Sequence, residues 1–212
     1  MNQHSRRGPF ESLCVGAGFA LVLAGCAFTR PPPVKSMFLL DPALPAAAAT
    51  PHPAALRVGA LTVAGPFRDR SFVLRETQTR YATDFYDEFV TPPGPMLAEV
   101  TSRALSRARA FAHVAAPGAS LQADYVLDGF VSALYADHRT RGACTAVIAV
   151  TFYLSQSDSG NGVPFWSGDY RRETRCRDES AAAYVEALNA GLAEILHKLT
   201  TDLAAIKLPP AP

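Results

Sequence analysis

The stretch "ACTAVIAVTFYL", residues 143–154, decides the fold expected for this chain. It is long, free of proline and rich in β-branched residues, and its side chains alternate as they do in a strand. A polar turn cluster, "SDSGNG" at 157–162, follows it, and "VPFWSGDYRRETRC" at 163–176 then returns. We therefore expect an antiparallel hairpin whose turn is centred near Gly160.

The register of this hairpin places two cysteines opposite each other. With the turn centred at 160, the numbers of paired residues add up to about 320, so Leu154 faces Trp166 and Cys144 faces Cys176. Cysteines that face each other on neighbouring antiparallel strands come close enough for a disulfide. The sequence predicts a Cys144–Cys176 bond, although two separate buried thiols stay possible because a register can slip by two residues.

Further β-prone runs surround the hairpin. "LRVGALTV" at 56–63 alternates like a strand, 72–75 and 79–82 are two short strand-like pieces, and "DYVLDGFVSALYAD" at 124–137 is a long one. Together they predict a mixed, largely antiparallel β-sheet.

Two amphipathic helices complete the predicted domain. From Pro95 to Ala108 apolar residues recur at spacings of three and four, with Arg103 and Arg107 on the other face, which we interpret as solvated. From Tyr184 to Ile206 the apolar stripe is longer, and Asp178 or Ser180 is its expected N-cap. This stripe suits either a partner helix or the protein's own sheet. The fold class expected is α/β (α+β mixed), with both helices packed on the sheet.

The N-terminus has the order of a secretory signal. Arg6 and Arg7 precede an apolar run at 13–23, which is too short to span a bilayer. The following "LAGC", residues 23–26, resembles the lipobox of bacterial lipoprotein precursors, which implies a signal peptide at 1–25 and acylation, including a diacylglycerol, on Cys26. A short core helix with an idle thiol is the alternative. Export also favours oxidation of the cysteine pair.

The residues after Cys26 are rich in proline and alanine. We assign 26–55 to a tether and 56–208 to the folded domain. "MFLLD" at 37–41 interrupts the tether and is expected to form an edge strand.

Composition and motifs argue against several functions. The formal net charge of +1 gives no basic field for nucleic acid. No phosphate loop, serine elbow or metal-ligand spacing stands out, and His138 is the one histidine near other polar groups. We predict no enzyme, no metal and no cofactor beyond the lipid on Cys26.

The segment "DFYDEF", residues 84–89, gathers three carboxylates around aromatic residues. It lacks the ligand pattern of a calcium loop, so packing of its aromatic side chains onto the domain is one interpretation. Contact with a partner is the other, because aromatic residues are enriched in interface cores. The candidate partner-binding residues are Phe85, Tyr86 and Phe89.

The order of lipobox, "MFLLDP", "LRVGALTV", "FVLRETQTRYATDFYDEFVTPPGPMLAEVTSRAL", "ADYVLDGFVSALYAD" and a terminal amphipathic helix resembles the ABC-type transport auxiliary lipoprotein family, the paraquat-inducible lipoprotein group. The resemblance implies a fold similar to the N-terminal domain of the Tol-system translocation protein. It also implies an ABC permease, its ATPase and a mammalian-cell-entry-type protein as partners in lipid transport, and a homo-oligomer is possible. Family members commonly have tryptophan where this chain has Phe89, and the cysteine pair is not a general family feature.

The residue after the acylated cysteine bears on location. Ala27 is not the aspartate that retains enterobacterial lipoproteins in the inner membrane, so the resemblance implies the periplasmic leaflet of the outer membrane. Two other functions stay open. One is a lipoprotein that regulates or assembles another envelope machine, such as cell-wall synthesis, and the other is a tethered hydrolase that depends on His138.

Overall fold

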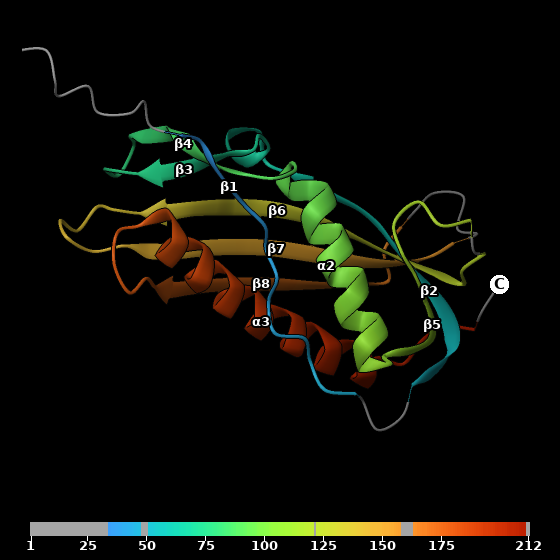
Figure 1. Ribbon diagram of the computed structural model, residues 1–212. Coiled ribbons are helices and arrows are strands. Elements are labelled where there is room, and N and C mark those ends of the chain that lie inside the picture. Colours follow the sequence, from blue (N-terminus) through green and yellow to red (C-terminus); the bar gives the residue numbers. More distant parts are fainter. Residues whose placement is uncertain (1–33, 48–50, 121, 158–162, 211–212) are drawn as a thin grey trace, which may run out of the picture. The chain divides into compact units, whose positions relative to one another are not determined.

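Residues 34–47, 51–120, 122–157 and 163–210 are described by a computed structural model (Figure 1). Lys35–Pro212 is one compact unit, and the predicted signal peptide and Cys26 lie outside the described residues. In chain order the elements are β1 (Ser36–Phe38), β2 (His52–Val63), a 3-10 turn η2 (Gly65–Phe67), β3 (Ser71–Arg75), β4 (Tyr81–Phe89), α2 (Pro93–Ala108), β5 (Phe111–Ala115), β6 (Tyr125–Asp137), β7 (Thr145–Gln156), β8 (Trp166–Arg175) and α3 (Ala181–Ala205).

The strands form one mixed sheet, which confirms the predicted fold class. Its path is β1-β4-β3-β6-β2-β5, and β7 then β8 continue from the other side of β6. The long ladders β6–β7 and β7–β8 and the short β3–β4 hairpin are antiparallel, whereas β1–β4, β2–β5, β2–β6 and β3–β6 are parallel. Sequence patterns missed β5 and the parallel partners, because parallel pairing joins segments that are far apart along the chain.

The β7–β8 hairpin has the predicted register. Leu154 pairs with Trp166, and every pair down to Thr145 and Arg175 adds up to 320. One step beyond the ladder, the Cys176 amide donates a hydrogen bond to the Cys144 carbonyl at 2.9 Å. A disulfide joins the two side chains, whose Cα atoms are 5.2 Å apart.

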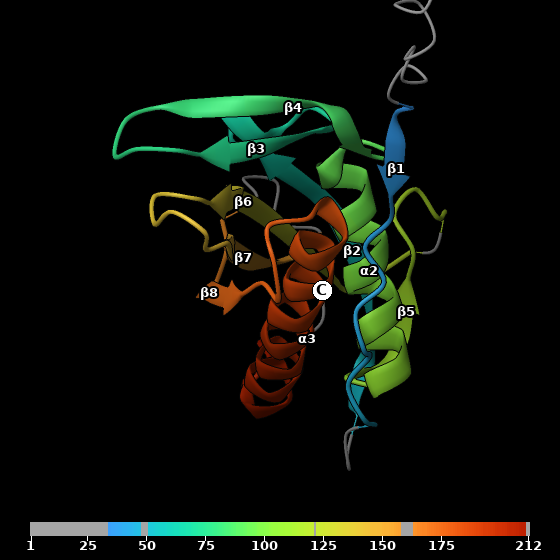
Figure 2. The same cartoon turned by 60° about the vertical axis from the view of Figure 1, so that its left-hand side comes forward.

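Both helices lie on the same face of the sheet, α2 over β2 and β5 and α3 over β7 and β8 (Figures 1 and 2). Their apolar stripes form the core with the inward side chains of the strands. Ser180 caps α3, because its side chain accepts a hydrogen bond from the Ala183 amide. Gly94 in the first turn of α2 permits close approach to β2, since a Cβ there would lie 2.5 Å from the Leu61 carbonyl oxygen. Of the two possibilities left open for the terminal helix, the structure shows that α3 packs on the protein's own sheet.

The folded unit begins earlier than the sequence boundary at residue 56. Residues 35–47, assigned to the tether, contain β1, which pairs with β4 as an edge strand, and a segment that crosses between α2 and α3 (Figures 1 and 2). Leu40 is fully buried there, and Asp41 contacts Arg103 of α2 and Asn189 of α3. The proline content of this segment did not distinguish the two possibilities, because proline occurs both in linkers and in extended segments that pack on a domain.

Candidate partner-binding site

The "DFYD" part of β4, residues 84–87, forms a bulge. Val73 pairs with Thr83 but Ser71 pairs with Glu88, so β4 carries extra residues opposite β3. Asp84 stabilises the bulge by accepting hydrogen bonds from the amides of residues 86 and 87, at 2.8 and 3.0 Å. The aspartate therefore shapes the backbone that presents the two aromatic residues.

The bulge turns two of the three candidate aromatic residues outward. Phe85 is 71% exposed and Tyr86 is 43% exposed, and their rings meet edge-to-face at 5.1 Å. The Lys35 ammonium lies 4.9 Å from the centre of the Phe85 ring. Such exposed, pre-ordered aromatic residues are suited to an interface.

Phe89 does not belong to this surface. It is 2% exposed, and its ring packs against Phe72 at 4.6 Å between centroids. After the bulge the strand alternation resumes and directs Phe89 into the core, so the candidate surface keeps only Phe85 and Tyr86 from the original three.

Apolar side chains of the neighbouring strands extend the exposed surface. The exposed fractions are 61% for Met37 of β1, 56% for Leu39 just after β1 and 48% for Val90 just after β4. We call Phe85, Tyr86, Met37, Leu39 and Val90 the bulge surface. These residues come from adjacent chain segments, because β1 pairs with β4 and the Val90 amide donates a hydrogen bond to the Phe38 carbonyl.

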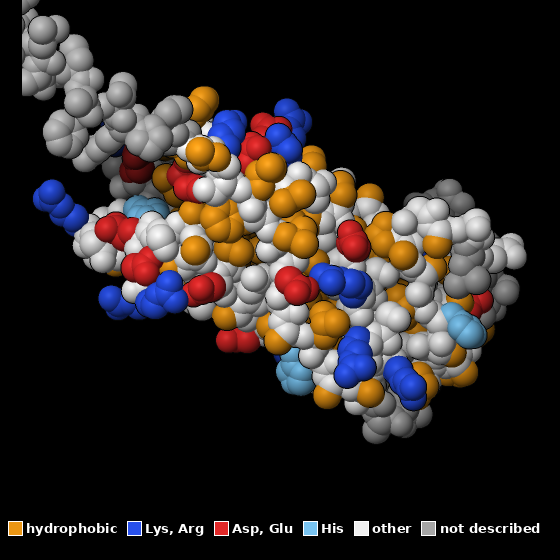
Figure 3. All heavy atoms as spheres, in the orientation of Figure 1, with side chains coloured by type: hydrophobic (Ala, Val, Ile, Leu, Met, Phe, Trp, Pro, Cys, Tyr) orange, Lys and Arg blue, Asp and Glu red, His pale blue; other side chains and the backbone are white. Residues whose placement is uncertain are grey.

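A pocket of about 550 Å³ opens beside the bulge, lined by residues of β3, β4, the end of β6 and the first turn of α3 and by residues that adjoin these elements. Its polar lining is Glu76, Asp84, Asp87, His138, Glu179 and Ser180. Its apolar lining is Phe72, Leu74, Ala136, Ala181 and Tyr184. We call it the acidic pocket, and Figure 3 shows acidic side chains gathered around a histidine at the left-hand end of the face drawn.

The negative charge of the acidic pocket is poorly compensated. Glu76 forms an ion pair with Arg80, and Glu179 approaches the His138 ring at 3.4 Å. Asp84 and Asp87 have no basic partner among the described residues. The pocket therefore has a negative potential that favours a positively charged group.

His138 is not positioned as a catalytic base for Ser180, the serine in the pocket lining. The Ser180 hydroxyl hydrogen-bonds Asp178 and accepts the Ala183 amide, which is the arrangement of a helix cap. Across the described ranges, no group of three His, Cys, Asp or Glu side chains is arranged to hold a metal ion. The lining suits binding better than nucleophilic chemistry.

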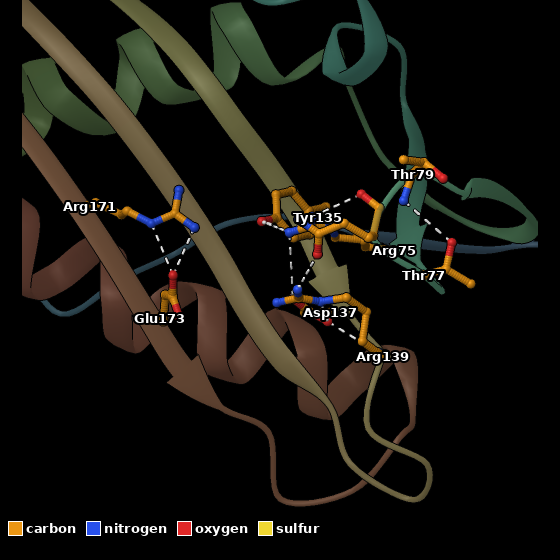
Figure 4. Close-up of polar contacts among 9 residues, drawn as sticks. Arg75, Thr77, Thr79, Tyr135, Asp137, Arg139, Arg171 and Glu173 are labelled. Atoms are coloured by element: carbon orange, nitrogen blue, oxygen red, sulfur yellow. Dashed lines mark hydrogen bonds and ion pairs between the residues drawn. The ribbon is translucent and has the colours of Figure 1, made fainter.

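A separate polar cluster lies on the opposite face of the sheet (Figure 4). Arg139 pairs with Asp137 at 2.8 Å, and Arg75 donates a hydrogen bond to the Tyr135 hydroxyl at 3.3 Å. The hydrogen bond from Arg139 is the main reason why the pKa of Asp137 is lowered. Arg75 and Arg139 share the Asp137 carboxylate, and Tyr135 belongs to a small buried cluster that includes Val147. We interpret the cluster as structural.

Sequence reasoning singled out the "DFYDEF" segment, but it predicted neither the bulge nor the pocket. Glu76, His138 and Glu179 come from three segments that meet only in the folded unit. Alternation along β3 was the one available signal, because it places Phe72, Leu74 and the following Glu76 on one side.

A family model described as the ABC-type transport auxiliary lipoprotein component matches residues 38–199. A comparison with curated proteins finds no match. Among the described residues no helix has the length and apolar character needed to span a membrane.

Solved structures share the fold. A Xanthomonas campestris protein of the DUF330 family is 18% identical and superposes with a TM-score of 0.69, covering 78% of this chain and 93% of that one. A second solved structure, of an uncharacterized protein, superposes with a TM-score of 0.63 at 16% identity, covering 80% of this chain and 99% of that one. The dodecameric PelC of Paraburkholderia phytofirmans has a TM-score of 0.40 at 22% identity, covering 73% of this chain and 92% of that one. At these identities the first two resemblances show the fold alone.

Proposed function

Because this chain belongs to the ABC-type transport auxiliary lipoprotein family, we propose that it is a lipid-anchored, non-catalytic component of a transport system that moves lipids or other hydrophobic solutes across a bacterial envelope. Its role in that system is to hold a transport partner at the membrane to which the lipid is attached.

The proposed anchor is Cys26 of the "LAGC" motif. Acylation there leaves eight residues between the lipidated cysteine and Lys35, where the folded unit begins. One acyl chain binds a membrane only marginally, whereas two or more make the attachment durable. Ala27 at the following position supports the periplasmic leaflet of the outer membrane as the location.

The proposed contact with the partner is the bulge surface. The observation that carries it is the 71% exposure of Phe85 on a backbone that Asp84 holds in place. A preformed aromatic contact loses little conformational entropy on binding. The partners proposed are a mammalian-cell-entry-type protein and the ABC permease and ATPase, in keeping with the resemblance of the chain to the family. A homo-oligomer stays a prediction.

Crosslinking in cells followed by purification of this protein tests the proposed function. We expect subunits of an ABC transport system to co-purify, and fewer of them with Phe85→Ala. Recovery of a cell-wall synthase without any transporter subunit would support the other envelope machine instead.

The anchor has an independent test. Metabolic labelling with a fatty acid should label the wild-type protein and leave Cys26→Ser unlabelled. Equal labelling of both proteins would contradict lipidation at Cys26. The tethered hydrolase makes a different prediction, namely an activity that His138→Ala abolishes, and a folded protein inert to esterase and glycosidase substrates would count against it.

A further inference from the structure

The acidic pocket lies beside the exposed aromatic pair, and the same short segment builds both. Within residues 84–87, Asp84 and Asp87 line the pocket while Phe85 and Tyr86 are exposed. A partner that covers the bulge surface therefore reaches the mouth of the pocket. This relation rests on the proposed partner-binding function.

The charges of the pocket select a cation but not a small metal ion. Four carboxylates line it, from Glu76, Asp84, Asp87 and Glu179, and His138 is the one basic side chain in the lining. They come from the β3–β4 connection, from β4 and from the residues just before α3, and no metal-type cluster is found in the described part of the chain. Dispersed acceptors suit an extended cation with several donors.

The wall formed by α3 adds a second, independent sign of a ligand. Tyr184 lines the pocket and is 3% exposed, and its hydroxyl has no hydrogen-bond partner among the described residues. Leaving a buried hydroxyl unpaired is unfavourable, because its hydrogen bonds with water are lost and not replaced. Burial also raises the pKa of Tyr184, so the phenol stays neutral.

Among cations, the guanidinium of arginine fits these walls best. It is planar and presents five donors, which can serve carboxylates on different sides. The aliphatic stem that carries it can pack on Leu74 and Ala181, two half-buried apolar residues of the lining. An ammonium group has fewer donors and no planar face.

We propose that the acidic pocket receives an arginine side chain of the protein partner that covers the bulge surface. A protein source is favoured over a lipid headgroup such as ethanolamine, because the phosphate of such a headgroup would lie close to the same carboxylates. The aromatic pair anchors the partner, and the pocket selects it by charge.

Titration of the purified full-length protein with the peptide acetyl-Gly-Arg-Gly-amide tests the proposal by NMR. We expect saturable shifts at the Ser180 and Ala181 amides, which line the pocket. The same peptide with citrulline, which keeps the shape but not the charge, should cause none. Equal shifts with citrulline would overturn the proposal.

Variants show whether the pocket is responsible. The double variant Asp87→Asn/Glu179→Gln should weaken binding about tenfold, because it removes two charges that face the ligand. Tyr184→Phe should weaken it less and leave the fold intact. Glu186→Gln is the matched control, since Glu186 lies on α3 outside the pocket and pairs with Arg177. Equal loss of binding in that control would overturn the assignment.

Two further probes separate the sources of the cation. The lysine peptide should bind more weakly than the arginine peptide, and phosphoethanolamine should bind more weakly still. If phosphoethanolamine binds more tightly than the arginine peptide, the cation comes from a lipid headgroup and not from a protein. If the lysine peptide binds as tightly as the arginine peptide, the choice of arginine is wrong. If the protein crosslinks to transporter subunits but does not bind the arginine peptide, the proposed role of the pocket is wrong and the proposed function still holds. If the protein binds the arginine peptide but forms no such crosslinks, the proposed function is wrong and the pocket still binds a guanidinium.

Discussion

Cys144 and Cys176 face each other one step beyond the last pair of the β7–β8 ladder, and their disulfide closes the open end of that hairpin. Both side chains are buried, at 2 and 5% exposure, and Cys176 is the first residue of the connection from β8 to α3. The bond therefore links the central sheet to the connection that positions α3 and the wall of the acidic pocket.

We expect Cys144→Ser/Cys176→Ser to lower the free energy of unfolding by about 3–4 kcal/mol, as the chain-entropy model gives for a sequence separation of 32 residues. Urea unfolding of the oxidised wild type, the reduced wild type and the double variant measures this. The reduced wild type should resemble the variant. Equal stability of all three would show that the bond does not brace the domain.

Phe89 and Phe85 should respond oppositely to truncation. Phe89→Ala removes a ring from the core and should cost about 3–5 kcal/mol in unfolding free energy. Phe85→Ala removes an exposed ring and should change stability by less than about 0.5 kcal/mol. Thermal and urea unfolding of both variants provide the comparison, and a stable Phe89→Ala protein would contradict its place in the core.

Asp137 should make the stability depend on pH in the acid range. Its hydrogen bonds with Arg139 lower its pKa below that of the unfolded chain, about 3.9. A lowered pKa stabilises the folded state above the unfolded pKa, and this contribution disappears as the pH falls through the folded pKa. Asp137→Asn should therefore be less stable than the wild type at pH 7, and the difference should shrink below about pH 4.

Asp69→Asn is the control for removal of an aspartate, because Asp69 is exposed and has no ion pair among the described residues. It should change the free energy of unfolding by less than about 0.5 kcal/mol at pH 7. A difference for Asp137→Asn that grows as the pH falls would contradict the predicted sign.

Local patterns predicted the β7–β8 hairpin because its two strands are neighbours in the sequence and one turn fixes their register. They also predicted α3, whose apolar stripe repeats over many turns. Phe89 was misplaced because the bulge at Asp84 shifts the alternation of β4, and a shift of this kind depends on hydrogen bonds that strand periodicity does not record.

The remaining features depend on contacts between distant segments. β5 is short, and its partner is β2, more than fifty residues earlier. The acidic pocket needs β3, β6 and α3 to meet, so neither its volume nor the unpaired Tyr184 hydroxyl follows from any single stretch. The candidate aromatic pair was predicted, whereas the pocket beside it required the structure.

The central claim is that this lipoprotein binds a transport partner through its bulge surface. A photoreactive phenylalanine analogue at position 85 tests it directly in cells, with the same analogue at Tyr153, an exposed residue of β7, as the control. The account predicts an adduct with a subunit of an ABC transport system from position 85 and none from position 153. Adducts only with proteins outside any transporter, or the same adducts from both positions, would contradict it.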